Sequence, residues 1–210
     1  ELPPGAVLGG WLPVHHDMGL IGNLLLSIFV GGECWLMSPA TFLMRPARWL
    51  QLIHDSRAMM SGAPNFAYDL CVTRIREKDV SNLDLSQWTR AFNGAEPVRA
   101  ETVARFSSRF APLGFRPEFM LPCYGLAEAT LFVSGGKPSH PPVTYTVDAA
   151  ALSQDRVQPA TSEHADDQRI LVGCGRVWHD TQVAIVDPTT CMPCPPDQVG
   201  EIWIANQSVA

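Results

Sequence analysis

The sequence has no apolar run long enough to cross a lipid bilayer, which takes about 20 residues. Its most apolar window runs from Leu20 to Gly32 and is interrupted by Gly22, Asn23 and Ser27. A signal peptide and internal repeats are also missing. We therefore expect a soluble globular protein without a transmembrane span.

Basic residues are scarce and scattered. The chain has 15 Lys and Arg against 21 Asp and Glu, which gives a formal net charge of -6 and a pI near 5.4. A nucleic-acid surface needs clustered positive charge to follow the phosphates, and this sequence has no such cluster. Nucleic acid is not an expected partner.

A disulfide framework is not needed to hold this chain together. Its 210 residues are 46% hydrophobic, which is enough to bury a core. The six cysteines are spread along the chain and fit reduced thiols better than paired ones. We therefore expect a cytoplasmic protein.

Complete sets of metal ligands are also lacking. Cys191 and Cys194 form one CxxC, but no second such pair follows, so a turn with two thiols is favoured over a zinc site. His15 and His16 are adjacent, and on an extended segment their side chains would point to opposite faces. A packed or gating histidine is therefore favoured over a shared ion.

Short apolar segments alternate with amphipathic ones along the first half of the chain. We expect strands within residues 33–39, 58–64 and 89–95, and helices within residues 45–57, 66–78 and 98–114. This order predicts an α/β fold with a mainly parallel, helix-covered sheet. Ligands of such sheets bind beyond the carboxyl ends of the strands.

The amino-acid composition changes at about residue 135. Residues 135–169 are rich in Pro, Ser, Asp and Gln, with one strand-like run, "VTYTVD", and we interpret them as a polar surface insertion. Three β segments follow, within residues 170–177, 181–187 and 199–206. We therefore divide the chain into an α/β part (1–134), the insertion (135–169) and a β-rich subdomain (170–210).

Two segments, "NGAEPV" and "CYGLAEAT", carry a pattern that fits a nucleotide. Each follows a short apolar strand and contains a glycine, so the backbone can approach a flat ligand closely. Tyr124 supplies an aromatic face for adenine, and Glu128 supplies a carboxylate for a divalent cation shared with phosphates. The alternative, that Tyr124 is core and Glu128 is an acid at a helix N-terminus, is equally consistent with these residues.

Five segments together resemble the fatty acyl-AMP ligases of the adenylate-forming superfamily, which also contains acyl-CoA ligases. They are "WLPVHHDMGLIG", "GAPNFAYDLC", "AFNGAEPVRAETVARF", "CYGLAEATLFVSGG" and "VGEIWIANQSVA". The resemblance covers nearly the whole chain and is specific because the motifs occur in the family's order. It implies the large-lobe α/β fold of an AMP-binding, ATP-dependent enzyme.

The resemblance also implies site residues. Glu128 is the metal ligand that holds Mg²⁺ against the ATP phosphates, and His16 stands where the acyl carboxylate meets the phosphate. The implied nucleotide-binding residues are Asn93, Gly94, Ala95, Glu96, Pro97, Tyr124, Gly125, Leu126 and Ala127. The implied acyl-binding residues are Met18, Gly19, Pro64 and Phe66.

The implied reaction activates a fatty acid with ATP to an acyl-adenylate and pyrophosphate. The acyl group then passes to the phosphopantetheine thiol of an acyl carrier protein, often one of a polyketide or lipopeptide synthase. An acyl-CoA ligase and a non-catalytic acyl- or nucleotide-binding module are the alternatives. An insertion near residues 135–169 favours the acyl-AMP ligase, because in this family it is thought to restrain the mobile lobe.

Two positions depart from the family pattern, and some motifs are missing. Ala127 stands where the superfamily commonly has Thr, which is typical of the acyl-AMP ligase branch, and His15 replaces an aromatic residue. The phosphate loop with its Lys, the ribose-binding Asp and the catalytic Lys of the C-terminal lobe are not found in the sequence. Since the chain also begins with Glu1 rather than Met, we expect the central fragment of an enzyme, inactive alone.

Overall fold

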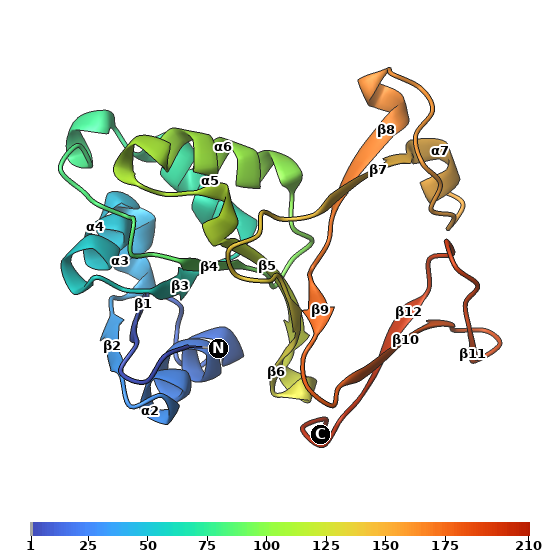
Figure 1. Ribbon diagram of the computed structural model, residues 1–210, viewed down its shortest axis with the longest axis horizontal. Coiled ribbons are helices and arrows are strands. Elements are labelled where there is room, and N and C mark those ends of the chain that lie inside the picture. Colours follow the sequence, from blue (N-terminus) through green and yellow to red (C-terminus); the bar gives the residue numbers. More distant parts are fainter. Residues whose placement is uncertain (1) are drawn as a thin grey trace.

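The protein is described by a computed structural model that covers residues 2–210. Within these residues the main sheet has seven strands in the order β2-β1-β3-β4-β5-β6-β9 (Figure 1). Its strands are β1 (Val7–Gly10), β2 (Glu33–Leu36), β3 (Met60–Gly62), β4 (Arg90–Asn93), β5 (Met120–Leu126), β6 (Leu131–Gly135) and β9 (Arg176–Val177).

The predicted mainly parallel sheet is confirmed. β1 pairs in parallel with β2 and β3, and the pairs β3–β4 and β4–β5 are parallel as well. β6 pairs antiparallel with both β5 and β9. The carboxyl ends of β1, β3, β4 and β5 therefore meet at one edge of the sheet.

Helices cover the sheet, with α3 to α6 on one side of it and α2 on the other (Figure 1). The α-helices are α1 (Asp17–Gly19), α2 (Leu26–Phe29), α3 (Pro39–Met44), α4 (Ala47–Ser56), α5 (Asn65–Arg74), α6 (Ala100–Phe110) and α7 (Ala149–Leu152). A π-helix, η1 (Leu20–Leu25), joins α1 to α2. The 3-10 turns are η2 (Glu77–Asp79), η3 (Ala111–Leu113), η4 (Pro117–Phe119), η5 (Ala127–Ala129) and η6 (Ala165–Asp167).

The three predicted helices are present, with one boundary corrected. α4 begins directly after Pro46 and buries Trp49, Leu50 and Ile53 on one face, as its periodicity predicts. α5 ends at Arg74 rather than Lys78, because Ile75 adopts an extended backbone and is buried in the core.

The core between these helices and the sheet is built from aromatic rings. Trp49 is fully buried, and its ring lies edge-on to those of Tyr68 and Trp88, at centroid distances of 5.4 and 5.2 Å. Their polar tips all have partners: Trp49 Nε1 donates to Ser61 Oγ at 2.8 Å, Trp88 Nε1 to the Ser61 carbonyl at 3.0 Å, and the Tyr68 hydroxyl to the Phe92 carbonyl at 2.7 Å. Buried aromatic residues with satisfied polar atoms make this core both large and specific.

The C-terminal part is rich in β-strands, as predicted, and extends away from the main sheet (Figure 1). β7 (Thr144–Asp148) pairs antiparallel with β8 (Gln168–Val172). β10 (Gln182–Asp187) lies between β11 (Met192–Pro193) and β12 (Glu201–Ala205). β8 crosses the expected boundary at residue 170, so the polar segment shares a hairpin with the part that follows it.

None of the helices between residues 2 and 210 is both long and apolar enough to pass through a bilayer. All six cysteines are unpaired in the structure.

Candidate active site

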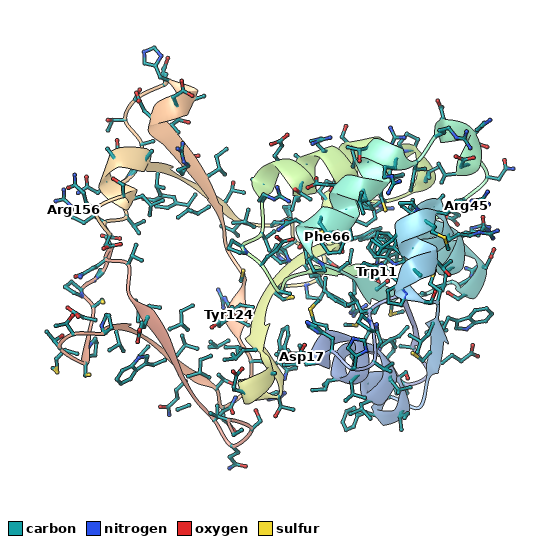
Figure 2. The ribbon with its side chains drawn as sticks, turned by 180° about the vertical axis from the view of Figure 1, so that it is seen from behind. Trp11, Asp17, Arg45, Phe66, Tyr124 and Arg156 are labelled. Carbon is teal, nitrogen blue, oxygen red and sulfur yellow. The ribbon has the colours of Figure 1, made fainter. Side chains whose placement is uncertain are left out.

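A hollow of about 470 Å³ lies where α1 and η1 meet the amino end of β3 and the carboxyl ends of β4 and β5. Figure 2 shows Asp17 and Tyr124 close to it on facing elements, with Arg156 far away on the C-terminal part. The lining residues are His15, His16, Asp17, Met18, Gly22, Met60, Phe92, Ala95, Cys123, Tyr124, Gly125, Ala127, Leu131 and Phe132.

Some of the residues implied by the resemblance line the hollow, and others do not. Those that line it are His16, Met18, Ala95, Tyr124, Gly125 and Ala127. Those that do not are Gly19, Pro64, Phe66, Asn93, Gly94, Glu96, Pro97, Leu126 and Glu128. Sequence reasoning missed the apolar lining at Met60, Phe92, Cys123, Leu131 and Phe132, because these positions look like ordinary core residues in the sequence.

The two histidines lie in a turn before α1, where an extended segment was expected. The backbone N–H of His16 donates to the Pro13 carbonyl at 3.0 Å, and both histidines line the hollow. His16 Nδ1 lies 2.5 Å from Asp17 Oδ1, which also accepts the Met18 N–H at 2.8 Å. The Met18 N–H also lies 3.2 Å from His16 Nδ1, which can accept it, so Asp17 and the start of α1 together fix the position of the ring.

Tyr124 and Gly125 lie in strand β5, where the sequence suggested a turn. The β5–β6 pairing joins Tyr124 to Ser134 and then shifts register, so that Gly125 faces Phe132. A Cβ on Gly125 would lie 1.6 Å from the Leu131 carbonyl oxygen, so only glycine permits this close approach. The turn itself follows at η5 (Ala127–Ala129).

The structure bears on both alternative interpretations of Tyr124 and Glu128. Tyr124 is only half-buried and lines the hollow instead of the core. Glu128 lies in η5, which has three residues, so there is no helix whose dipole its charge could stabilise. Its side chain is exposed and open to a ligand.

Glu128 is an exposed carboxylate next to Ala127, which lines the hollow, and its role as a Mg²⁺ ligand stays a prediction. Among residues 2–210, no three His, Cys, Asp or Glu side chains gather into a metal site. Mg²⁺ commonly binds one or two carboxylates and takes its other ligands from water and phosphate oxygens. A single exposed carboxylate is sufficient for such an ion.

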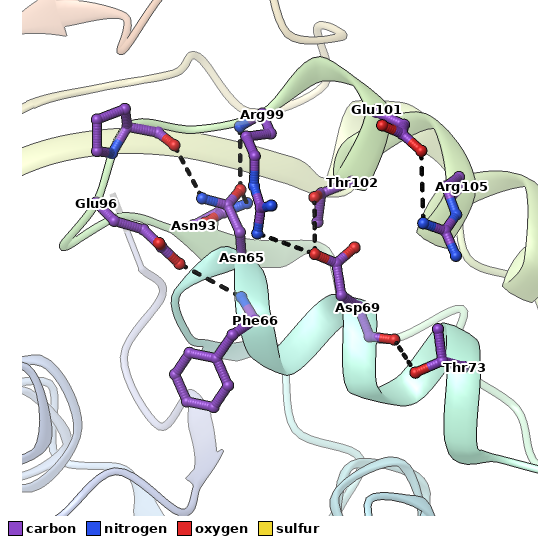
Figure 3. Close-up of polar contacts among 11 residues, drawn as sticks. Asn65, Phe66, Asp69, Thr73, Asn93, Glu96, Arg99, Glu101, Thr102 and Arg105 are labelled. Atoms are coloured by element: carbon purple, nitrogen blue, oxygen red, sulfur yellow. Dashed lines mark hydrogen bonds and ion pairs between the residues drawn. The ribbon is translucent and has the colours of Figure 1, made fainter.

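A buried amide network holds the loop at residues 94–97 (Figure 3). Asn65 Nδ2 donates to the Pro97 carbonyl at 2.9 Å, while Asn65 Oδ1 accepts the Arg99 N–H at 3.0 Å and Asn93 Nδ2 at 3.1 Å. Glu96 accepts the Phe66 N–H at 3.3 Å. Hydrogen bonds that join Asn93, Glu96 and Pro97 to residues 65 and 66 therefore hold the loop in place.

Ala95, in the same loop, lines the hollow with a left-handed backbone, φ 67°. A non-glycine residue in this conformation is strained, and such strain is often found at ligand sites. The loop thus presents Ala95 to the hollow, while its neighbours hold it in place.

The thiol of Cys123 is not a nucleophile in this site. Burial raises the pKa of Cys123 to about 12, and its Sγ donates to the Asn93 carbonyl at 3.5 Å. The reactive thiolate is therefore almost absent at neutral pH.

This burial predicts the order of alkylation. At pH 7.5, iodoacetamide should label exposed Cys191 much faster than half-buried Cys123, whose raised pKa leaves little thiolate until the protein unfolds. Peptide mass spectrometry with and without urea measures both sites. Labelling of Cys123 in the folded protein at the rate of Cys191 would contradict the assigned burial.

The model of the AMP-binding enzyme family matches residues 1–210, the whole chain. The chain belongs to the AMP-binding enzyme family. The part of the hollow lined by Ala95, Tyr124 and Gly125 thus lies in a chain whose entire length fits that family.

Individual relatives agree with this family. The chain is 43% identical over 204 residues to the medium-chain-fatty-acid–[acyl-carrier-protein] ligase TtuA of Teredinibacter turnerae, covering 97% of this chain and 32% of TtuA. It is 38% identical over 208 residues to the long-chain-fatty-acid–AMP ligase FadD28 of Mycobacterium tuberculosis, covering 99% of this chain and 35% of FadD28. The chain therefore spans about a third of the length of these curated relatives.

A solved structure agrees with the fold. The crystal structure of a fatty acyl-adenylate ligase from L. pneumophila, in complex with acyl adenylate and pyrophosphate, superposes with a TM-score of 0.93 at 47% identity. That match covers 99% of this chain and 36% of the other.

Proposed function

We propose that residues 1–210 are the central part of a longer enzyme that activates a fatty acid with ATP and forms a fatty acyl-adenylate. The observation that carries this proposal is that one hollow has two kinds of lining, one suited to a nucleotide base and one to an alkyl chain. Ala95, Tyr124 and Gly125 suit a flat base, while Met60, Phe92 and Leu131 suit an alkyl chain. The family match and the fatty-acid ligases among the relatives support the same reaction.

In this reaction a carboxylate oxygen of the fatty acid attacks the α-phosphorus of ATP. The bond from that phosphorus to the bridging oxygen breaks, and pyrophosphate leaves with both electrons. The two reactants are anionic, so the site must offset the charge that builds up between them. Mg²⁺, when bound, would neutralise phosphate charge, and Glu128 would hold it.

The residues of this chain would orient the reactants. Tyr124 would pack against adenine while the loop at residues 94–97 borders the base from the other side. His16, with its ring fixed by Asp17, would direct Nε2 toward the reacting carboxylate. Met18 and the apolar lining would hold the alkyl chain, with Gly19, Pro64 and Phe66 bordering its path.

The acyl acceptor is proposed to be the phosphopantetheine thiol of an acyl carrier protein, such as one of a polyketide synthase. The name of TtuA supports a carrier protein as partner. An acyl-CoA ligase is the second candidate, and the acceptor assay below distinguishes the two. Six unpaired cysteines are compatible with a cytoplasmic setting.

Pyrophosphate exchange tests the adenylation step. The full-length enzyme with Mg²⁺ and a fatty acid should exchange labelled pyrophosphate into ATP, and residues 1–210 alone should remain at background. No exchange with any fatty acid from 6 to 18 carbons would favour the non-catalytic binding module.

Residues 153–167 test the choice of acceptor. This segment contacts the C-terminal β-rich part, since the Val157 N–H donates to the Asp197 carbonyl at 2.7 Å and the Val199 N–H to the Asp155 carbonyl at 2.8 Å. Deleting residues 153–167 from the full-length enzyme should keep adenylation and raise acyl-CoA formation above that of the parent. The reason is that the C-terminal lobe of the full-length enzyme would then be less restrained.

The deletion can be closed without strain. α7 ends at Leu152, and Gln168 pairs with Asp148 at the end of the β7–β8 hairpin, so a short Gly/Ser bridge can join the two ends. An unchanged ratio of acyl-CoA to acyl-carrier product, in a variant that still forms acyl-adenylate, would show that the acceptor is selected elsewhere.

A further inference from the structure

Four arginines line a second hollow, of about 530 Å³, between the start of α4 and the end of α5. Its lining consists of residues 44–48 and 74–76 together with Gln51 and Asp79, and it shares no residue with the candidate active site. Figure 2 shows Arg45 at the edge of the α/β part, away from Asp17 and Tyr124. The arginine-lined hollow is therefore a separate feature of the surface.

The fold brings these arginines together from two parts of the sequence. Arg45 and Arg48 lie at the start of α4. Arg74 and Arg76 lie at the end of α5, and Arg76 Nε is paired with Asp79 Oδ2 at 2.9 Å. Among residues 2–210, Asp79 is the only acid that lines this hollow, so it neutralises one of four positive charges.

Two of the arginines have no acidic partner. Within residues 2–210, neither Arg45 nor Arg48 forms an ion pair, although both side chains are exposed. By contrast, Arg99 on the neighbouring loop lies 3.0 Å from Asp69. Like charges that share a hollow repel each other, and an anion bound between them removes that repulsion. The unpaired arginines therefore favour an anionic ligand.

The N-terminus of α4 opens into the same hollow. Pro46 and Ala47 are among the lining residues, and no side chain caps this end of the ten-residue helix. The helix dipole adds positive potential there. Guanidinium groups match phosphate oxygens with two parallel hydrogen bonds, and the volume is that of a site for a small ligand. Phosphate is therefore the anion that fits this hollow best.

We propose that the arginine-lined hollow binds phosphate groups of a ligand, apart from the candidate active site. A soluble polyphosphate and the headgroup of an anionic phospholipid both present this chemistry. Leu43 and Met44, which are 47% and 73% exposed beside the arginines, would contact the apolar part of a lipid if that is the source. This inference does not depend on the proposed adenylation of a fatty acid.

Two binding measurements on the full-length enzyme distinguish the sources. Calorimetry with inorganic pyrophosphate, without Mg²⁺, represents the soluble ligand. Sedimentation with vesicles of phosphatidylglycerol and phosphatidylcholine represents the lipid. Arg45→Gln combined with Arg48→Gln should weaken binding of the matching probe by about 30-fold, or about fivefold for each arginine. Added NaCl should weaken binding by the parent as well, because it screens exposed charges.

Arg156→Gln combined with Arg169→Gln is the matched control. Both arginines are exposed and lie outside the arginine-lined hollow, so this variant should bind like the parent. Arg45→Lys combined with Arg48→Lys keeps the charge and should lose less affinity than the glutamine pair. Circular dichroism establishes that each variant is folded. Pyrophosphate that binds in the candidate active site should remain in every variant, since the two hollows share no lining residue.

The outcomes separate the two sources and the failure of the proposal. A loss of pyrophosphate binding in the glutamine variant identifies a soluble phosphate compound as ligand. A loss confined to vesicle binding identifies an anionic headgroup. A parent that binds neither probe, or a folded glutamine variant that binds both probes like the parent, would overturn the phosphate site.

Discussion

Replacing Glu128 by Gln in the full-length enzyme is expected to slow acyl-adenylate formation by about 100- to 1,000-fold. The amide keeps the volume of the side chain but loses the charge that would hold Mg²⁺ against the phosphates. Removal of one such electrostatic contact to a transition state costs about 2.7 to 4 kcal/mol in other enzymes. Single-turnover formation of acyl-adenylate, followed by mass spectrometry, measures this step.

A Mg²⁺ titration identifies the cause of the loss. The variant should need more Mg²⁺ for half-maximal rate, while fatty-acid binding, measured by calorimetry, should hardly change. Glu201→Gln, an exposed acid on β12, is the matched control and should behave as the parent. Near-normal adenylation by Glu128→Gln at every Mg²⁺ concentration would remove Glu128 from the metal site.

Replacing Trp49 by Ala is expected to lower the free energy of unfolding by about 3–5 kcal/mol. The indole is fully buried among the rings of Trp11, Phe42, Tyr68 and Trp88. Its loss leaves a cavity and also removes the donor to Ser61 Oγ. Since domains are stable by only about 5–15 kcal/mol, this one change should nearly unfold the domain at 37 °C.

Urea denaturation followed by circular dichroism measures the effect. Trp49→Phe keeps a ring and should lose less stability than Trp49→Ala. Trp203→Ala makes the same substitution at a site that is 45% exposed and should change the free energy of unfolding by less than about 0.5 kcal/mol. Equal losses at residues 49 and 203 would mean that Trp49 is not the centre of the core.

Local patterns in the sequence predicted much of the sheet and its helices. α4 could be predicted because Pro46 marks its start and its apolar residues recur with a helical period. β3 and β4 could be predicted because short apolar segments end at glycine or proline. In each case, the residues that form the sequence pattern are the same residues that form the helix or strand.

Features that depend on distant contacts could not be predicted. Residues 123–126 look like a glycine turn, but pairing with β6 extends them as a bulged strand. The π-helix at residues 20–25 and the turn before α1 also have no local signature. The hollow forms where segments that are far apart in the sequence come together, so its apolar lining was missed even though Tyr124 and Ala95 were found.

One position could have been interpreted better from the sequence alone. Successive side chains of a strand point to opposite faces, so Phe92 and Asn93 at the end of β4 cannot both face one ligand. Phe92 lines the hollow, and Asn93 points to Asn65. Strand alternation thus indicates that Asn93 supports the loop at residues 94–97, as the amide network in Figure 3 also indicates.

A crystal structure of the enzyme with an acyl-sulfamoyl adenosine, a stable analogue of the acyl-adenylate, tests the central claim most directly. We predict that adenine packs against Tyr124 and the loop at residues 94–97, with the acyl linkage beside His16. The alkyl chain should lie along Met60, Phe92 and Leu131. An analogue bound outside this hollow, or one whose base does not touch Tyr124, would contradict the account.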